Sequence, residues 1–187
     1  MLGLIVYRIR SFTTLALDTA YIMRLIIPSL LALIASVRAG GIAVVLNNSP
    51  DPIYVWSVGG TVGPRHDIKA GQTHASCNFF QLTATGGIYW EEMHHDDKSG
   101  GIAIKMTKEA DGLNSGAPQQ VWAYNLDGGT VWYDLSTVFG APFAGSRLDV
   151  TGDNGGSIVW PNGIHPGGNQ LTKAPSEGNI FFSINPA

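Results

Sequence analysis

From residue 40 onward, apolar and polar residues alternate in short runs that glycine-rich segments separate. The clearest run is IAIKMT (102–107), in which Ile102, Ile104 and Met106 share one face of an extended strand. No stretch of this region has the period of an amphipathic helix. The pattern therefore predicts an all-β domain built from half-buried antiparallel strands.

Further strands are expected where aromatic and β-branched residues cluster, as in IYVWSV (53–58) and QVWAYNL (120–126). GIAVVLN (41–47) and NIFFSI (179–184) are the expected first and last strands. The segment YNLDGGTVWYDL predicts a tight hairpin, because residues 127–129 (Asp-Gly-Gly) can supply the positive φ angles of its turn. Many short strands at this spacing are typical of a β-sandwich.

Residues 1–39 have a different character. From Met23 the chain reads MRLIIPSLLALIASVRAGG, with the basic Arg24, an apolar run at 25–37 and the small residue Ala39. This is the layout of a signal peptide, and the run is shorter than the roughly 20 residues that span a bilayer. We expect a hydrophobic signal helix that is cleaved near Ala39, leaving one domain at 40–187.

One signal needs no second apolar segment before it, so residues 1–22 have no role in this scheme. Our hypothesis is that translation starts at Met23 and that residues 1–22 come from a misplaced gene start. The alternative is a longer signal or a signal anchor, with Arg8 and Arg10 as its basic flank.

Residues 40–187 contain seven basic and thirteen acidic residues, a net charge of −6. This charge argues against nucleic acid and against an anionic membrane as partners after signal cleavage, and we expect a monomer. The lone cysteine, Cys77, cannot form an internal disulfide. We expect it to be a small buried residue, the alternatives being a reactive thiol or an intermolecular bridge.

Four segments resemble the fungal family named for the Blastomyces yeast-phase-specific protein, whose members are also called antigenic thaumatin-like proteins. They are VVLNNSPDPIYVWSVGGTVGP (44–64), SGGIAIKMT (99–107), GAPQQVWAYNLDGGTVWYDLSTVFGAPFAG (116–145) and SIVWPNGIHPGG (157–168). The resemblance implies a small protein, secreted or attached to the cell wall, with a thaumatin-like β-sandwich. It implies no cofactor and no catalytic residue set.

The chain departs from the family in two places. Family members often carry cysteines at about Ser49 and Ala174, so the resemblance implies a disulfide that this chain has lost. ASCNFFQLTATGG (75–87) also reads as extra sequence within the family pattern. We interpret it as a translated intron, in which case Cys77 belongs to the insertion.

The segment YWEEMHHDDKSGG (89–101) concentrates metal-ligand chemistry in a chain with few charges. If it continues as a strand, Glu92, His94 and Asp96 share one face and form a candidate site for a divalent ion. The spacing matches no specific metal motif. The interpretation that we favour is an exposed strand running into a hairpin turn, with charges that protect a sheet edge from aggregation.

Paired carboxylates and exposed aromatics are the other candidate chemistry. Glycoside hydrolysis needs two carboxyl groups, and the candidates are Glu91, Glu92, Asp96, Asp134 and Asp149. Five tryptophans could stack on sugar rings or fill the core: Trp56, Trp90, Trp122, Trp132 and Trp160. Alternation places Trp122 and Tyr124 on the same face. Asn47 begins the one glycosylation sequon, which Pro50 disfavours.

The sequence therefore predicts a non-enzymatic protein, secreted or attached to the cell wall, that binds wall polysaccharide or a host surface protein. One alternative is a β-glucan hydrolase with a carboxylate pair in an acidic cleft. The other is a divalent-metal binder built around Glu92, His94 and Asp96.

Overall fold

The computed structural model describes residues 40–71 and 87–186. The predictions for residues 1–39, for Cys77, and for all but Gly87 of the inserted segment lie outside these residues. In the part of the chain that the structure describes, no helix is long and apolar enough to cross a membrane.

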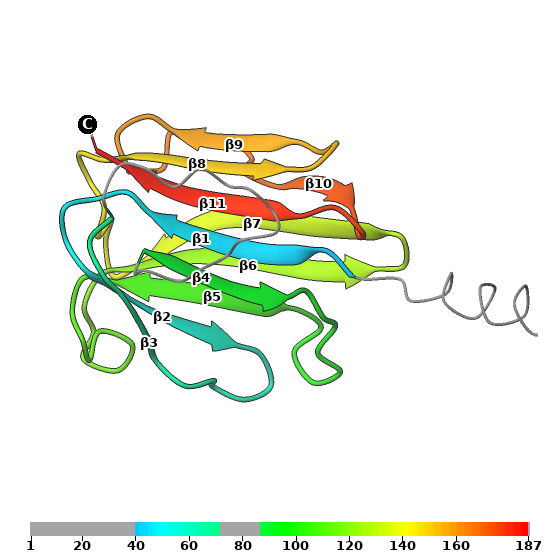
Figure 1. Cartoon of the computed structure of the whole chain (residues 1–187), viewed down its shortest axis with the longest axis horizontal. Helices are drawn as coiled ribbons and strands as arrows, with labels where there is room; N and C mark the ends of the chain where they lie inside the picture. Colours follow the sequence, from blue (N-terminus) through cyan, green and yellow to red (C-terminus); the bar gives the residue numbers. More distant parts are fainter. Residues whose placement is uncertain (1–39, 72–86, 187) are drawn as a thin grey trace, which may run out of the picture. The chain divides into compact units, whose positions relative to one another are not determined.

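Two sheets make up the domain, as Figure 1 shows. The five-stranded sheet has the order β4-β1-β11-β8-β9, and the six-stranded sheet has the order β10-β7-β6-β5-β2-β3. The strands are β1 (Ile42–Asn47), β2 (Ile53–Val58), β3 (His66–Ile68), β4 (Ile88–Glu92), β5 (Ile102–Thr107), β6 (Gln119–Asp127), β7 (Thr130–Val138), β8 (Arg147–Gly152), β9 (Ser157–Trp160), β10 (Thr172–Pro175) and β11 (Ile180–Asn185).

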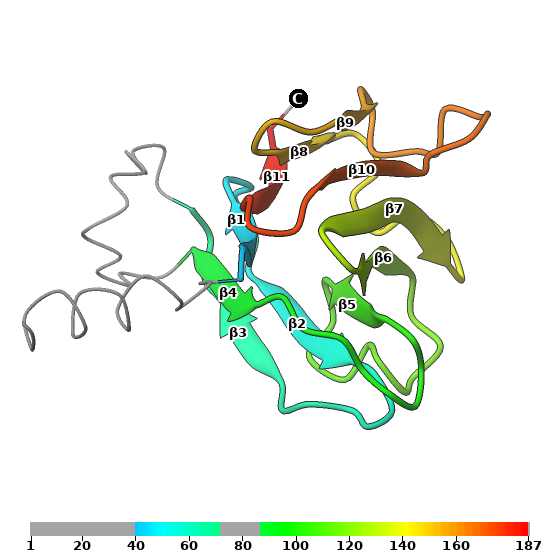
Figure 2. The ribbon, with the colours of Figure 1, turned by 90° about the vertical axis from the view of Figure 1, so that its right-hand side faces the viewer.

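Figure 2, which looks along the strands, shows the two sheets as two layers. Side chains between the layers are buried because alternate residues of each strand point inward. Trp122 of β6 and Phe182 of β11 are both fully buried and stack across the gap, with ring centroids 6.0 Å apart. The expected all-β sandwich is confirmed.

Several strand predictions are confirmed at their bounds. Residues 53–58 and 102–107 are β2 and β5, and Ile102, Ile104 and Met106 are all buried, as their alternation indicates. The hairpin joins β6 to β7, and Gly128 has the positive φ of 59° that its turn requires. The first and last strands pair with each other in parallel, so the sandwich is not wholly antiparallel.

The predicted hairpin at 89–101 is wrong. β4 ends at Glu92 and lies in the five-stranded sheet, whereas β5 lies in the six-stranded sheet. The segment therefore crosses between the layers. β4 is nevertheless an edge strand, which agrees with the expected placement of its charges.

The implied disulfide between the positions of Ser49 and Ala174 is also contradicted. The Gly41 N–H, just before β1, donates to the Ser176 carbonyl oxygen at 3.0 Å, whereas Ser49 lies beyond the other end of β1. A six-residue strand spans roughly 20 Å, far more than the Cα separation of about 4–7 Å that a disulfide allows. Ala174 instead packs beside the β8–β9 turn.

Candidate binding groove

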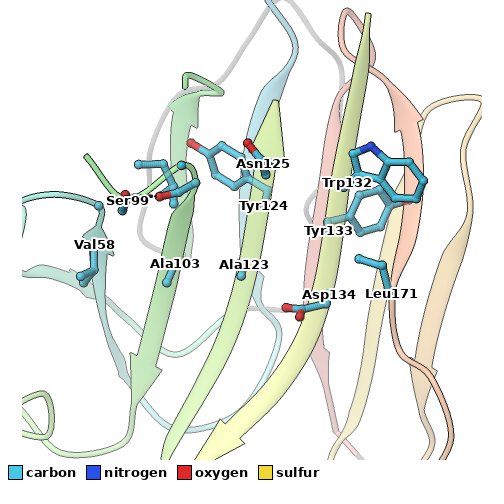
Figure 3. Close-up of a pocket in the computed structure, with 14 residues that line it drawn as sticks. Val58, Ser99, Ala103, Ala123, Tyr124, Asn125, Trp132, Tyr133, Asp134 and Leu171 are labelled. Carbon is cyan, nitrogen blue, oxygen red and sulfur yellow. Dashed lines mark hydrogen bonds between the residues drawn. The ribbon is translucent and has the colours of Figure 1, made fainter. Parts of the chain in front are cut away.

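A shallow groove of about 660 Å³ lies on the outer face of the six-stranded sheet (Figure 3). The strand register creates it, because Val58, Ala103, Ala123 and Asp134 lie in one row across β2, β5, β6 and β7. The two alanines are small and form a low floor between taller side chains. We call this surface the groove and name its two sides after Trp132 and Ser99.

The Trp132 side of the groove carries exposed apolar groups. Trp132 of β7 is 36% exposed, and Leu171, just before β10, is 50% exposed. The Lys173 ammonium lies over the Trp132 ring, 5.0 Å from its centroid, in a cation–π contact. The indole is therefore covered in part by Lys173 and exposed in part beside the groove.

Asp134 stands two residues after Trp132, so both side chains leave β7 on its outer face. Its Oδ1 atom is buried and has no hydrogen-bond partner among the described residues. Burial raises the pKa of this carboxyl above its usual range, and a hydrogen bond from the backbone of Ala123 opposes the shift. The groove thus contains a half-buried carboxylate whose Oδ1 is shielded from solvent, so a ligand would meet the other, partly exposed side of the group.

Two loops build the Ser99 side of the groove, and Asp96 joins them. One follows β2 and contains Gly60, and the other connects β4 to β5 and contains Asp96 itself. Asp96 Oδ1 accepts hydrogen bonds from the backbone N–H of Lys98 at 3.0 Å and of Ser99 at 2.8 Å, and it lies 2.9 Å from Ser99 Oγ. These bonds, with one from the backbone of Gly60, hold the pKa of Asp96 well below its usual range. A Cβ added to Gly60 would lie 2.6 Å from Lys98 Cβ, so the two loops touch closely.

The predicted metal trio does not converge in the structure. Because β4 ends at Glu92, the strand alternation that would align Glu92, His94 and Asp96 stops there. The Asp96 carboxylate forms a turn, and His94 Nδ1 lies 3.1 Å from the Glu92 carbonyl oxygen. Within residues 40–71 and 87–186, no group of three or more His, Cys, Asp or Glu side chains is arranged to hold a metal ion.

The other candidate carboxylates lie apart from Asp134. Glu91 points between the sheets, where it accepts hydrogen bonds from the hydroxyls of Tyr89 at 2.6 Å and Tyr124 at 2.8 Å. Burial and the Glu91 carboxylate raise the pKa of both tyrosines. Asp149, on the five-stranded sheet, pairs with Arg147 at 2.6 Å. Asp134 is the one carboxylate among the described groove residues.

The aromatic pair singled out in the sequence faces the core. Trp122 is fully buried and Tyr124 is 2% exposed, whereas Trp132 is the tryptophan beside the groove. Alternation along β7 puts Trp132 and Asp134 on one face, but alternation alone does not show that this face is the outer one. The cross-strand row of small residues that makes the groove was not readable from any single strand.

The sequon asparagine is structural in the folded chain. Asn47 is 1% exposed, and its Nδ2 donates to the carbonyl oxygens of Asp51 at 2.8 Å and Lys69 at 3.1 Å. Its Oδ1 accepts from Ser49 Oγ at 2.6 Å. A glycan on Nδ2 is incompatible with this arrangement, because the nitrogen is buried and both of its donors are used.

The two-layer β-sandwich is that of a thaumatin-like protein. The chain belongs to the Blastomyces yeast-phase-specific protein family, whose model matches residues 30–88 and 72–185. The two matched stretches overlap at residues 72–88, which include the extra residues predicted at 75–87. The predicted family is therefore confirmed.

Two curated relatives carry names that agree with this assignment. The chain is 30% identical to the secreted thaumatin-like protein calA of Emericella nidulans over 119 residues, 62% of this chain and 58% of the relative. It is 28% identical to an antigenic thaumatin-like protein of Arthroderma benhamiae over 126 residues, 65% and 55% of the two chains. The chain thus matches less than two-thirds of either relative, and the expected extracellular localisation is confirmed by their names.

Among solved structures, the protein elicitor MoHrip2 of Magnaporthe oryzae superposes with a TM-score of 0.57 at 20% identity. The match covers 78% of this chain and 98% of that one. At this identity, the likeness concerns the fold alone.

Proposed function

We propose that this secreted thaumatin-like protein is non-enzymatic and binds cell-wall polysaccharide in the groove. The observation that carries the proposal is the exposed ring of Trp132 beside the partly exposed carboxylate of Asp134, which forms no ion pair among the described residues. A sugar ring presents an apolar face that can stack on indole and hydroxyl groups that can donate to a carboxylate. An open groove with a low floor suits a polymer, because the chain can continue past both ends.

The chemistry of the groove favours binding over hydrolysis. Glycosidases need two carboxyl groups on either side of the scissile bond, and the described lining supplies Asp134 alone. The lining residues also include no histidine or cysteine that could activate a nucleophile. The β-glucan hydrolase and the divalent-metal binder expected as alternatives have no matching cluster in this groove.

Sedimentation with insoluble β-glucan and chitin tests the proposal. We expect the purified secreted protein to be retained without release of reducing sugar, and Trp132→Ala to bind about tenfold more weakly because the stacking ring is lost. Trp90→Ala is the matched control, since Trp90 is 52% exposed but lies on the five-stranded sheet. Sugar release, or equal retention of the wild type and Trp132→Ala, would contradict the proposal.

Retention on neither polysaccharide would point instead to a host surface protein, the other partner predicted from the sequence. The same tryptophan variants would then be tested against that partner.

A further inference from the structure

Asp134 is a charged group without an ion-pair partner among the described residues. It lies opposite Ala123 in the β6–β7 register. Its other neighbours on the outer face, along β7 and diagonally on β6, are also uncharged: Trp132, Ser136, Val121 and Asn125.

Two cations lie near Asp134 on this face. Lys173 of β10 is opposite Trp132 and therefore diagonal to Asp134, but its ammonium stands over the Trp132 ring and forms no ion pair with Asp134. Lys105 of β5 is in register with Val121 of β6, so a full strand separates it from β7. Neither lysine is among the residues that line the groove. The floor of the groove therefore has a negative charge that the protein does not neutralise there.

Partial burial of an unpaired carboxylate costs free energy, which a ligand can recover by bringing a positive group to it. A neutral sugar hydroxyl satisfies the hydrogen bond but not the charge. An ammonium group satisfies both, and the net charge of −6 on residues 40–187 also attracts a polycation. An anionic polysaccharide is disfavoured for the same reasons.

We propose that the groove prefers a cationic amino-sugar polymer, namely deacetylated chitin, with a glucosamine ammonium bound at Asp134 and a sugar ring stacked on Trp132. This inference rests on the proposed polysaccharide binding and names its ligand class. Acetylation of the amine removes the positive charge, so the N-acetylated polymer of the same length is the natural comparison.

Calorimetric titration with glucosamine oligomers and N-acetylglucosamine oligomers of equal length tests the preference. In low-salt buffer, at a pH that protonates the amine but lies above the raised pKa of Asp134, we expect the glucosamine oligomer to bind about tenfold more tightly, as one charge-assisted hydrogen bond allows. Added salt should remove much of the difference. The preference should also weaken as alkaline buffer removes the proton from the amine.

Asp134→Asn should abolish the preference for the glucosamine oligomer, because the amide keeps an acceptor but loses the charge. Glu109→Gln is the matched control: it removes one negative charge from an exposed residue beyond the opposite end of β5. The control should keep the preference. Unchanged thermal unfolding temperatures would show that both variants are folded.

Equal affinity for the two oligomers, or a preference that survives Asp134→Asn, would overturn the inference. So would oligolysine competing as strongly as the glucosamine oligomer, because the groove would then recognise basic peptides. If neutral polysaccharide were still retained through Trp132, the proposed function would stand although its ligand class was wrong.

Discussion

The ionised carboxylate of Asp134 lowers the stability of the fold, but it is the form that the proposed ligand ammonium binds. The folded chain raises the pKa of its carboxyl, so folding favours the protonated form. The resulting stabilisation is present below the ordinary aspartate pKa and is lost as the pH rises through the raised value. At neutral pH, Asp134→Asn should therefore increase the free energy of unfolding by about 0.5 kcal/mol, a figure that allows for solvent screening at this partly exposed position.

Urea denaturation at neutral and at acidic pH measures this effect, which should shrink in acid as wild-type Asp134 becomes protonated. If Asp134→Asn destabilised the protein at neutral pH, the carboxylate would have a structural partner and its availability to a ligand would be in doubt.

Glu91 is the contrasting carboxylate, because its acceptors are used inside the fold. Glu91→Ala leaves the hydroxyls of Tyr89 and Tyr124 without their partner, and we expect a loss of about 2 kcal/mol in the free energy of unfolding. Glu92→Ala, at the exposed next position, should change it by less than about 0.5 kcal/mol. Denaturant unfolding compares the two; equal effects would show that the Glu91 hydrogen bonds add nothing to stability.

At the scale of elements, Asp96 holds the Ser99 side of the groove. Asp96→Ala removes the acceptor for two backbone N–H groups, so we expect faster amide hydrogen exchange at Lys98 and Ser99 and polysaccharide binding that is about threefold weaker. Asp97→Ala is the control, since Asp97 is fully exposed. Unchanged exchange in Asp96→Ala would show that the loops keep their arrangement without the carboxylate.

The pH dependence of this turn follows from the lowered pKa of Asp96. Its stabilising effect is present above the ordinary aspartate pKa and is lost as the pH falls through the lowered value. The Ser99 side should therefore remain ordered in the buffers used for binding.

Individual strands were predictable because their side chains alternate within six or so residues, as in residues 53–58 and 102–107. The partner of a strand depends on contacts far away in the chain, which local alternation does not encode. The segment 89–101 was therefore assigned to a hairpin, although β4 and β5 lie in different sheets. For the same reason, alternation predicted a common face for Glu92, His94 and Asp96. The strand ends at Glu92, so the three side chains do not share a face.

At the scale of the whole molecule, the four segments that resemble the family predict the sandwich and the secretion of the protein, but they do not predict the groove. The row from Val58 to Asp134 combines residues separated by up to 76 positions in the chain and depends on the register of four strands. The outer position of Trp132 follows from Tyr133 pointing into the core. Only the assembled sheet distinguishes this tryptophan from the buried Trp122.

The most direct measurement of the central claim is the mapping of backbone amide chemical shifts during titration with a soluble chitin or β-glucan oligomer. If the oligomer binds in the groove, the largest chemical-shift changes should occur at Ala103, Ala123, Trp132 and Asp134. These residues lie on three neighbouring strands, β5, β6 and β7. The five-stranded sheet should change little. Changes concentrated on that sheet, or between the two layers, would contradict the groove as the binding site.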